Sequence, residues 1–68
     1  MPVREITLTA REEQVVRLIA AGETNTAIGH ELGVCYETVK SIIKNIRAKI
    51  GAKSRTAVAT WAGKNGVC

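Results

Sequence analysis

The sequence predicts an all-α domain of four helices, on the strength of three observations. Apolar residues recur at intervals of three and four positions, which is the spacing of one helix face. Residues that cap helix N-termini precede these stretches, and glycines follow them. No segment carries the pattern expected of a strand. A chain of 68 residues has room for one domain, which we place at residues 8–68 after a short leader at residues 1–7.

The composition predicts that the core of this domain is aliphatic. Hydrophobic residues make up 46% of the chain, but Phe is absent and Tyr36 and Trp61 are the only aromatic residues. Charged residues make up 24%, which is the proportion found in globular proteins and well below that of disordered segments. We therefore expect a small folded domain with few aromatic contacts.

The first helix is predicted at residues 10–21. Thr9 and Glu12 have the spacing of a capping box, in which each side chain accepts a hydrogen bond from the backbone amide of the other. Gly22 is suited to end the helix. Its apolar stripe consists of Val15, Leu18 and Ile19, with Val16 beside them.

A second, short helix is predicted at residues 25–32, with Thr24 or Asn25 as its cap. Gly29 in its interior costs about 0.5–1 kcal/mol relative to Ala, which is tolerable where another helix approaches closely. Gly33 then supplies the positive φ of a tight turn.

The third predicted helix, at residues 36–50, is the longest in the chain. Cys35 occupies its N-cap position and Gly51 ends it. At 100° per residue, one face is apolar and an adjacent face carries cations flanked by Glu37 and Ser41. The apolar residues are Val39, Ile42, Ile43, Ile46 and Ile50, and the cations are Lys40, Lys44 and Arg47.

Charge is distributed unevenly along the chain. Residues 1–39 contain three arginines and six glutamates, a net charge of −3, whereas residues 40–68 contain seven cations and no acid, a net charge of +7. Such asymmetry favours a polyanionic partner facing the second half. On charge alone, a solvated basic surface is an equally good interpretation.

Two helices joined by a glycine turn, the second longer and basic, describe a helix-turn-helix. The third helix is suited to the major groove of B-DNA, where Lys and Arg donate to guanine O6 and N7. Cations beyond that face, and the start of the second helix, are suited to phosphates. The residues assigned to phosphates are Lys49, Lys53 and Arg55 beyond the face, Arg47 on it, and Thr24 and Asn25 at the second helix.

A family resemblance rests on motifs distributed along most of the chain. These are Leu8-Thr9-x-Arg11-Glu12, Gly22-x-Thr24-Asn25-x-x-Ile28, Leu32-x-Val34, Thr38-Val39-Lys40, Ile46-x-x-Lys49-Ile50-Gly51 and Arg55-x-Ala57-Val58. In this order they resemble the LuxR/FixJ (NarL)-type DNA-binding domain over residues 8–67. The resemblance implies a four-helix domain whose third helix reads the major groove and whose fourth helix often dimerises.

The resemblance also implies roles for single residues. Base contacts fall on Lys40, Ser41 and Lys44. Backbone contacts fall near Thr24, Asn25, Thr38 and Lys49. Three positions depart from the family pattern: Ile42 stands where His is frequent, Gly29 where Ala is common, and Cys35 where Ser usually caps the helix.

The fourth helix is predicted to begin after Ser54, which is suited to cap it. Trp61 fits either the core or a dimer interface, because this helix has few other large apolar residues. A two-fold dimer would place two copies of the third helix about 34 Å apart, one turn of DNA. The candidate dimer contacts are Val58, Trp61 and Ala62.

Other classes of function are excluded or kept as alternatives. Paired acids, a phosphate-binding glycine loop and a Ser or Cys near the single His are all missing, so we expect neither an enzyme nor a cofactor. One His and no close Cys pair do not support a metal site. We expect Cys35 and Cys68 to be free thiols, with Cys35 buried at the turn.

We therefore expect a small transcriptional regulator of bacterial or phage type that binds double-stranded DNA sequence-specifically as a homodimer. The alternative is a module that binds another regulator or RNA polymerase without strong DNA binding of its own. The sequence has no signal-peptide pattern and no run of 18 apolar residues, so we expect a cytoplasmic protein.

Overall fold

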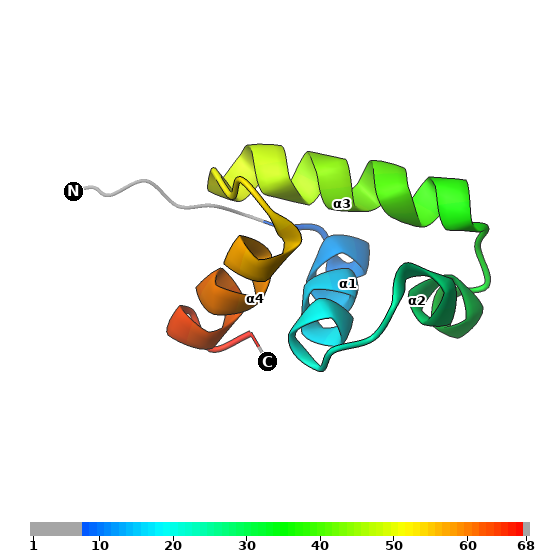
Figure 1. Ribbon diagram of the computed structural model, residues 1–68, viewed down its shortest axis with the longest axis horizontal. Helices are drawn as coiled ribbons and strands as arrows, with labels where there is room; N and C mark the ends of the chain where they lie inside the picture. Colours follow the sequence, from blue (N-terminus) through cyan, green and yellow to red (C-terminus); the bar gives the residue numbers. More distant parts are fainter. Residues whose placement is uncertain (1–7, 68) are drawn as a thin grey trace.

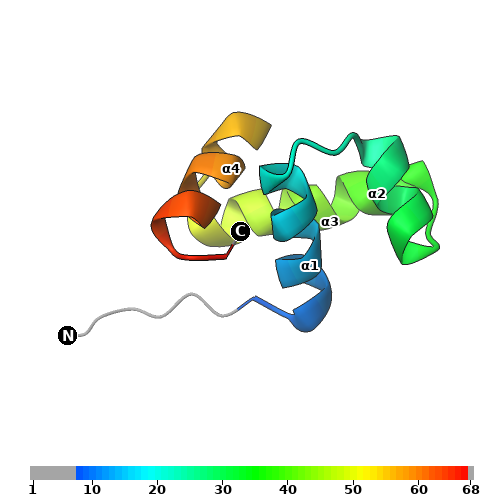
Figure 2. The same cartoon turned by 90° about the horizontal axis from the view of Figure 1, so that it is seen from below.

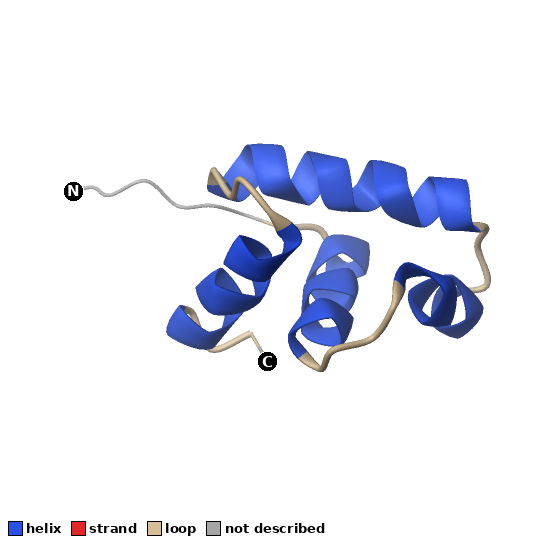
Figure 3. Cartoon of the chain, in the orientation of Figure 1, coloured by secondary structure: helices blue, strands red, loops and turns tan. Residues whose placement is uncertain are grey.

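A computed structural model describes residues 8–67, and its four helices lie where the sequence predicts them. Helix α1 spans Ala10–Ala20, α2 spans Asn25–Leu32, α3 spans Tyr36–Ile50 and α4 spans Arg55–Lys64. The described residues contain no strand (Figure 3), so the all-α prediction is confirmed. The leader expected at residues 1–7 and the thiol of Cys68 lie outside the described residues. Within residues 8–67, no helix combines the length and the apolar character needed to cross a bilayer.

Helix α3 lies along one side of the molecule, and the other three helices pack beneath it in a row (Figure 1). Seen from below, α4, α1 and α2 all cross over α3 (Figure 2). Helix α1 packs against α3 and α4, and α2 packs against α3. The core between them is aliphatic, as the composition predicts, and consists of Val15, Val16, Ile19, Ile28, Val39, Ile43, Ile46, Val58 and Ala62.

Side-chain caps fix the N-termini of three helices. The predicted capping box is present, because the Glu12 amide donates to Thr9 Oγ1 at 3.1 Å and the Thr9 amide donates to Glu12 Oε1 at 2.9 Å. Thr24 caps α2 and Ser54 caps α4 without such a reciprocal bond, each side-chain oxygen accepting a backbone N–H at 3.1 Å. Cys35 forms no side-chain cap bond at α3, which leaves the longest helix without the stabilisation that Ser supplies at this position.

The turn between α2 and α3 explains why glycine occupies position 29. The amide of Val34 donates to the carbonyl oxygen of Gly29 at 3.0 Å, and Gly33 between them has φ +71°. A Cβ atom added at Gly29 would lie 2.8 Å from the carbonyl oxygen of Val34. The nearest atom belongs to the backbone of the turn itself, and Cγ2 of Val39 in α3 follows at 3.5 Å, so another helix also approaches here as expected.

An ion pair joins the start of α1 to the end of α3. The ammonium group of Lys49 lies 2.7 Å from Glu12 Oε1, and the Glu12 side chain is only 12% exposed. The hydrogen bond from Lys49, followed by that from the Thr9 amide, lowers the pKa of Glu12 below its ordinary value. The capping box and the tertiary ion pair therefore share one carboxylate.

The contact at Gly29 predicts a difference between two Gly→Ala variants. Gly63→Ala in α4 places its Cβ in open space and is expected to stabilise the domain by about 0.5–1 kcal/mol through helix propensity. Gly29→Ala gains the same propensity but must displace a backbone carbonyl, so its free energy of unfolding is expected to fall at least about 1 kcal/mol below that of Gly63→Ala. Urea unfolding of both variants measures this difference. Equal free energies of unfolding would contradict the close contact between position 29 and the Val34 carbonyl oxygen.

The Glu12–Lys49 pair predicts a pH-dependent stability. Glu12→Gln is expected to lower the free energy of unfolding by about 0.5–1 kcal/mol at neutral pH, a range that allows for the solvent screening of the partly exposed Lys49. Because folding depresses the pKa of Glu12, its contribution is complete above the ordinary carboxyl pKa and disappears as the pH falls through the depressed value.

The neighbouring Glu13 supplies the matched control for this prediction. Its carboxylate lies 3.7 Å from Arg17 Nη2, and both side chains are exposed. Glu13→Gln is therefore expected to change stability little at any pH. Urea unfolding from neutral to acidic pH compares the two variants, and a constant Glu12→Gln effect over that range would rule out the linkage.

Candidate nucleic-acid interface

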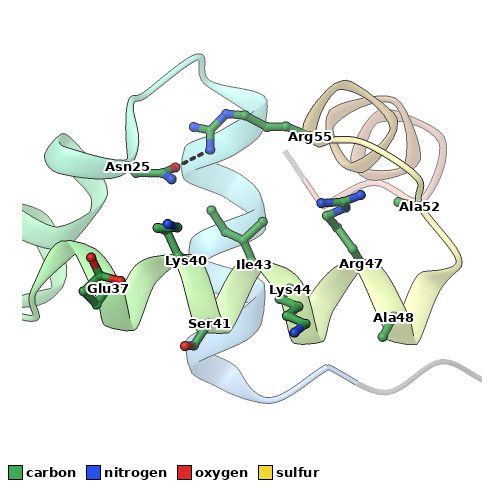
Figure 4. Close-up of a pocket in the computed structure, with 10 residues that line it drawn as sticks. All are labelled: Asn25, Glu37, Lys40, Ser41, Ile43, Lys44, Arg47, Ala48, Ala52 and Arg55. Carbon is green, nitrogen blue, oxygen red and sulfur yellow. Dashed lines mark hydrogen bonds between the residues drawn. The ribbon is translucent and has the colours of Figure 1, made fainter.

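Helix α3 presents opposite chemistry on its two sides. Val39 and Ile46 have no exposed surface, and Ile43 is 8% exposed, so this side of the helix is buried in the core. Lys40, Ser41 and Lys44 are exposed on the other side. They project from adjacent turns of the helix (Figure 4). The structure therefore brings together the three residues expected to contact bases.

The exposed side of α3 forms one wall of an open groove, which we call the α3 groove. Its other walls come from the first residue of α2, the first residue of α4 and the loop before α4. The groove contains four cations and one carboxylate, which suits a polyanion. Its lining residues are Asn25, Glu37, Lys40, Ser41, Ile43, Lys44, Arg47, Ala48, Ala52 and Arg55.

Lys40 and Lys44 are the cations of the α3 groove that have the fewest contacts with other charged or polar groups of the protein. Among the described residues, neither forms an ion pair with a carboxylate. The ammonium group of Lys40 lies 5.6 Å from the centroid of the Tyr36 ring, a cation–π distance that steadies the side chain without neutralising its charge. Both ammonium groups therefore remain available to an anionic partner.

Three other cations expected at phosphates form hydrogen bonds within the protein. Arg47 Nη2 donates to the carbonyl oxygen of Lys53, and Lys49 is paired with Glu12. Arg55 donates to Asn25 Oδ1 and to the carbonyl oxygen of Glu23. Arg47 Nε is buried and has no hydrogen-bond partner within the described part of the chain. These side chains connect segments of the fold.

The remaining residues expected at the DNA backbone lie at the surface. Lys53 is exposed in the loop between α3 and α4. Thr24 is exposed, and its hydroxyl oxygen accepts the α2 cap bond, which leaves the hydroxyl proton free to donate. The hydroxyl of Thr38 lies 3.3 Å from the sulfur of Cys35.

Cys35 itself is exposed, so the expectation of a buried thiol is wrong. The residue occupies the N-cap of α3, where its side chain faces solvent and not the core beneath the turn. The hydrogen bond with Thr38 lowers the pKa of the thiol below its ordinary value.

Two of the three residues expected at a dimer interface are buried. Val58 and Ala62 have no exposed surface, because both pack into the core of their own chain. A partner subunit has no access to them in this fold. Trp61 is half-buried against the same core and retains some exposed surface.

Comparison with known proteins agrees with this architecture. Residues 6–62 match the family described as bacterial regulatory proteins, luxR family. The chain is 45% identical over 58 residues to the transcriptional regulatory protein LiaR of Bacillus subtilis, covering 85% of this chain and 28% of LiaR. It is 43% identical over 63 residues to the transcriptional regulatory protein YdfI of the same organism, covering 93% of this chain and 30% of YdfI.

A third relative, the HTH-type transcriptional activator RamA of Corynebacterium glutamicum, is 42% identical over 48 residues, covering 71% of this chain and 17% of RamA. The chain thus spans less than a third of the length of each of these relatives. The match to the family covers the helix-turn-helix and most of α4. The chain belongs to the luxR family of bacterial regulatory proteins.

Proposed function

We propose that this chain binds double-stranded DNA sequence-specifically as the DNA-binding domain of a transcriptional regulator, with α3 in the major groove. The observation that carries the proposal is the exposed polar side of α3, where Lys40, Ser41 and Lys44 lie opposite the buried aliphatic side. A single helix fits the width of the major groove, and ammonium groups there donate to guanine O6 and N7. The hydroxyl of Ser41 adds a short group that both donates and accepts.

Phosphate contacts are proposed on the residues that flank this helix. Lys53 offers an exposed ammonium group beside one end of the α3 groove, and Thr24 and Asn25 open α2 beside the other. Thr38 extends the set in the first turn of α3. Arg47, Lys49 and Arg55 rank below these residues as phosphate contacts, because each already donates at least one hydrogen bond within the protein.

The names of the relatives support a role in transcription. LiaR and YdfI are named transcriptional regulatory proteins, and RamA is named a transcriptional activator. Binding to bacterial chromosomal DNA would place this chain in the cytoplasm.

We also propose that two chains bind one DNA site through α4. Trp61 is the candidate contact that keeps exposed surface, and it lies beside Leu8 and Val67 in a small cleft. A two-fold dimer would place the two α3 helices about 34 Å apart on the same face of the duplex. Sedimentation on a duplex selected from a random pool is expected to give two chains per duplex, and a one-to-one complex would exclude the dimer.

Lys40→Ala and Lys44→Ala are each expected to weaken binding to a selected duplex by about 1–3 kcal/mol, because each removes a base-directed donor. Both residues are exposed, so the free energy of unfolding of each variant, measured by thermal unfolding, is expected to stay within about 0.5 kcal/mol of the wild-type value. Lys64→Ala is the matched control, since it removes the same charge at the end of α4 that points away from α3 (Figure 1).

Fluorescence anisotropy of a labelled duplex at about 50 and 200 mM salt makes this measurement, and affinity is expected to fall steeply at the higher salt. If both lysine variants bound the duplex with wild-type affinity, this side of α3 would not be the surface that recognises DNA. Absence of binding at low salt would instead favour the alternative, a module that binds another regulator or RNA polymerase.

A further inference from the structure

One arginine connects the starts of two helices that line the α3 groove. Arg55 is the first residue of α4, and Asn25 is the first residue of α2. Nη1 of Arg55 donates to Asn25 Oδ1, and Nη2 donates to the carbonyl oxygen of Glu23 in the preceding loop. Both side chains are half-buried. The guanidinium group thus holds two acceptors from the segment that leads into α2.

This bond fixes which way the Asn25 carboxamide faces. A guanidinium group has donors only, so the amide must turn its oxygen toward Arg55 and its NH2 group to the other side. Figure 4 shows the amide nitrogen on the side facing Lys40. Among the described residues, no acceptor is hydrogen-bonded to this NH2 group. The α3 groove therefore contains the Asn25 NH2 group, a neutral donor held in one orientation, on the side facing the ammonium group of Lys40.

We propose that Arg55 is a positioning residue for DNA binding: it holds the Asn25 carboxamide so that its NH2 group donates to a DNA phosphate beside Lys40. The proposal rests on the proposed function and changes the role of Arg55 from phosphate contact to support. Fixing the amide before DNA arrives removes part of the ordering cost of association. Without Arg55, the Asn25 side chain rotates freely and its donor is lost from the groove.

A double-mutant cycle in DNA affinity tests this coupling. Arg55→Lys keeps the charge but cannot place two donors in a planar fork. Arg55→Lys and Asn25→Ala are each expected to weaken binding about tenfold, because each removes the same hydrogen bond to a charged group. The double variant is then expected to bind no more weakly than the single variants. Losses that multiply to about a hundredfold would overturn the proposal.

Asn25→Asp separates positioning from a purely structural role. The aspartate still accepts from Arg55, so its free energy of unfolding is expected to equal or exceed that of the wild type. It has no NH2 group and sets a negative charge toward the phosphate, so DNA binding is expected to fall more than in Asn25→Ala. Wild-type DNA binding by Asn25→Asp would show that the Arg55–Asn25 bond only stabilises the fold, and would overturn the proposal.

Matched controls exist elsewhere in the chain. Arg17 also donates to a backbone carbonyl, that of Val67, and Asn65 also forms a side-chain hydrogen bond, to the carbonyl oxygen of Trp61. Arg17→Lys and Asn65→Ala are expected to bind DNA as the wild type does. All variants are titrated with the same labelled duplex, below the temperature at which thermal unfolding begins.

The results distinguish a failure of this proposal from a failure of the proposed function. If Lys40→Ala and Lys44→Ala weaken binding while the Arg55 and Asn25 losses multiply, DNA binding stands and the positioning role of Arg55 is wrong. If the wild type does not bind the duplex at low salt, both are wrong. If Arg55→Lys unfolds, the Asn25→Asp and Asn25→Ala pair still decides whether the oriented NH2 group matters.

Discussion

The structure depends on the burial of one side of α3. This 15-residue helix contacts the other three, and its aliphatic residues are the surface on which α1, α2 and α4 meet. In a domain of this size, with a core that has no buried aromatic ring, few residues supply most of the apolar area that folding removes from water. Val39 and Ile46 have no exposed surface at all. Because one side of α3 is fixed in the core, the other side is held rigidly toward solvent. The packing of the core therefore determines the shape of the candidate interface.

Local signals made the four helices predictable. Thr9, Thr24 and Ser54 each cap the helix that follows, as their positions in the sequence indicate. Gly33 and Gly51 end helices in the left-handed conformation that other residues rarely adopt. Each of these features involves residues within four positions of one another, so a short stretch of sequence contains the whole interaction.

The internal hydrogen bonds of three cations could not be predicted, because no helical spacing places their partners beside them. Lys49 meets Glu12 across 37 positions, Arg55 meets Asn25 across 30, and Arg47 meets the backbone of Lys53 across 6. Helix geometry places Lys49 and Arg55 beyond the face of Lys40 and Lys44, but nothing in the sequence shows which cations have acceptors within the fold. Only the packing of α1 and α4 against α3 brings acceptors to some cations and leaves others facing solvent. The exposure of Cys35 was missed for a related reason, since an N-cap residue faces either side depending on how the turn packs.

The internal bonds do not affect the electrostatics equally. Lys49 is paired with a carboxylate, so its charge is largely cancelled beyond the immediate pair. Arg47 and Arg55 bind neutral carbonyl and amide oxygens, so both keep a full positive charge. Both line the α3 groove with Lys40 and Lys44. A polyanion approaching this groove is therefore attracted by four cations, of which only Lys40 and Lys44 donate no hydrogen bond within the described residues. All four residues of this surface thus contribute to the long-range attraction, whether or not they also support the fold.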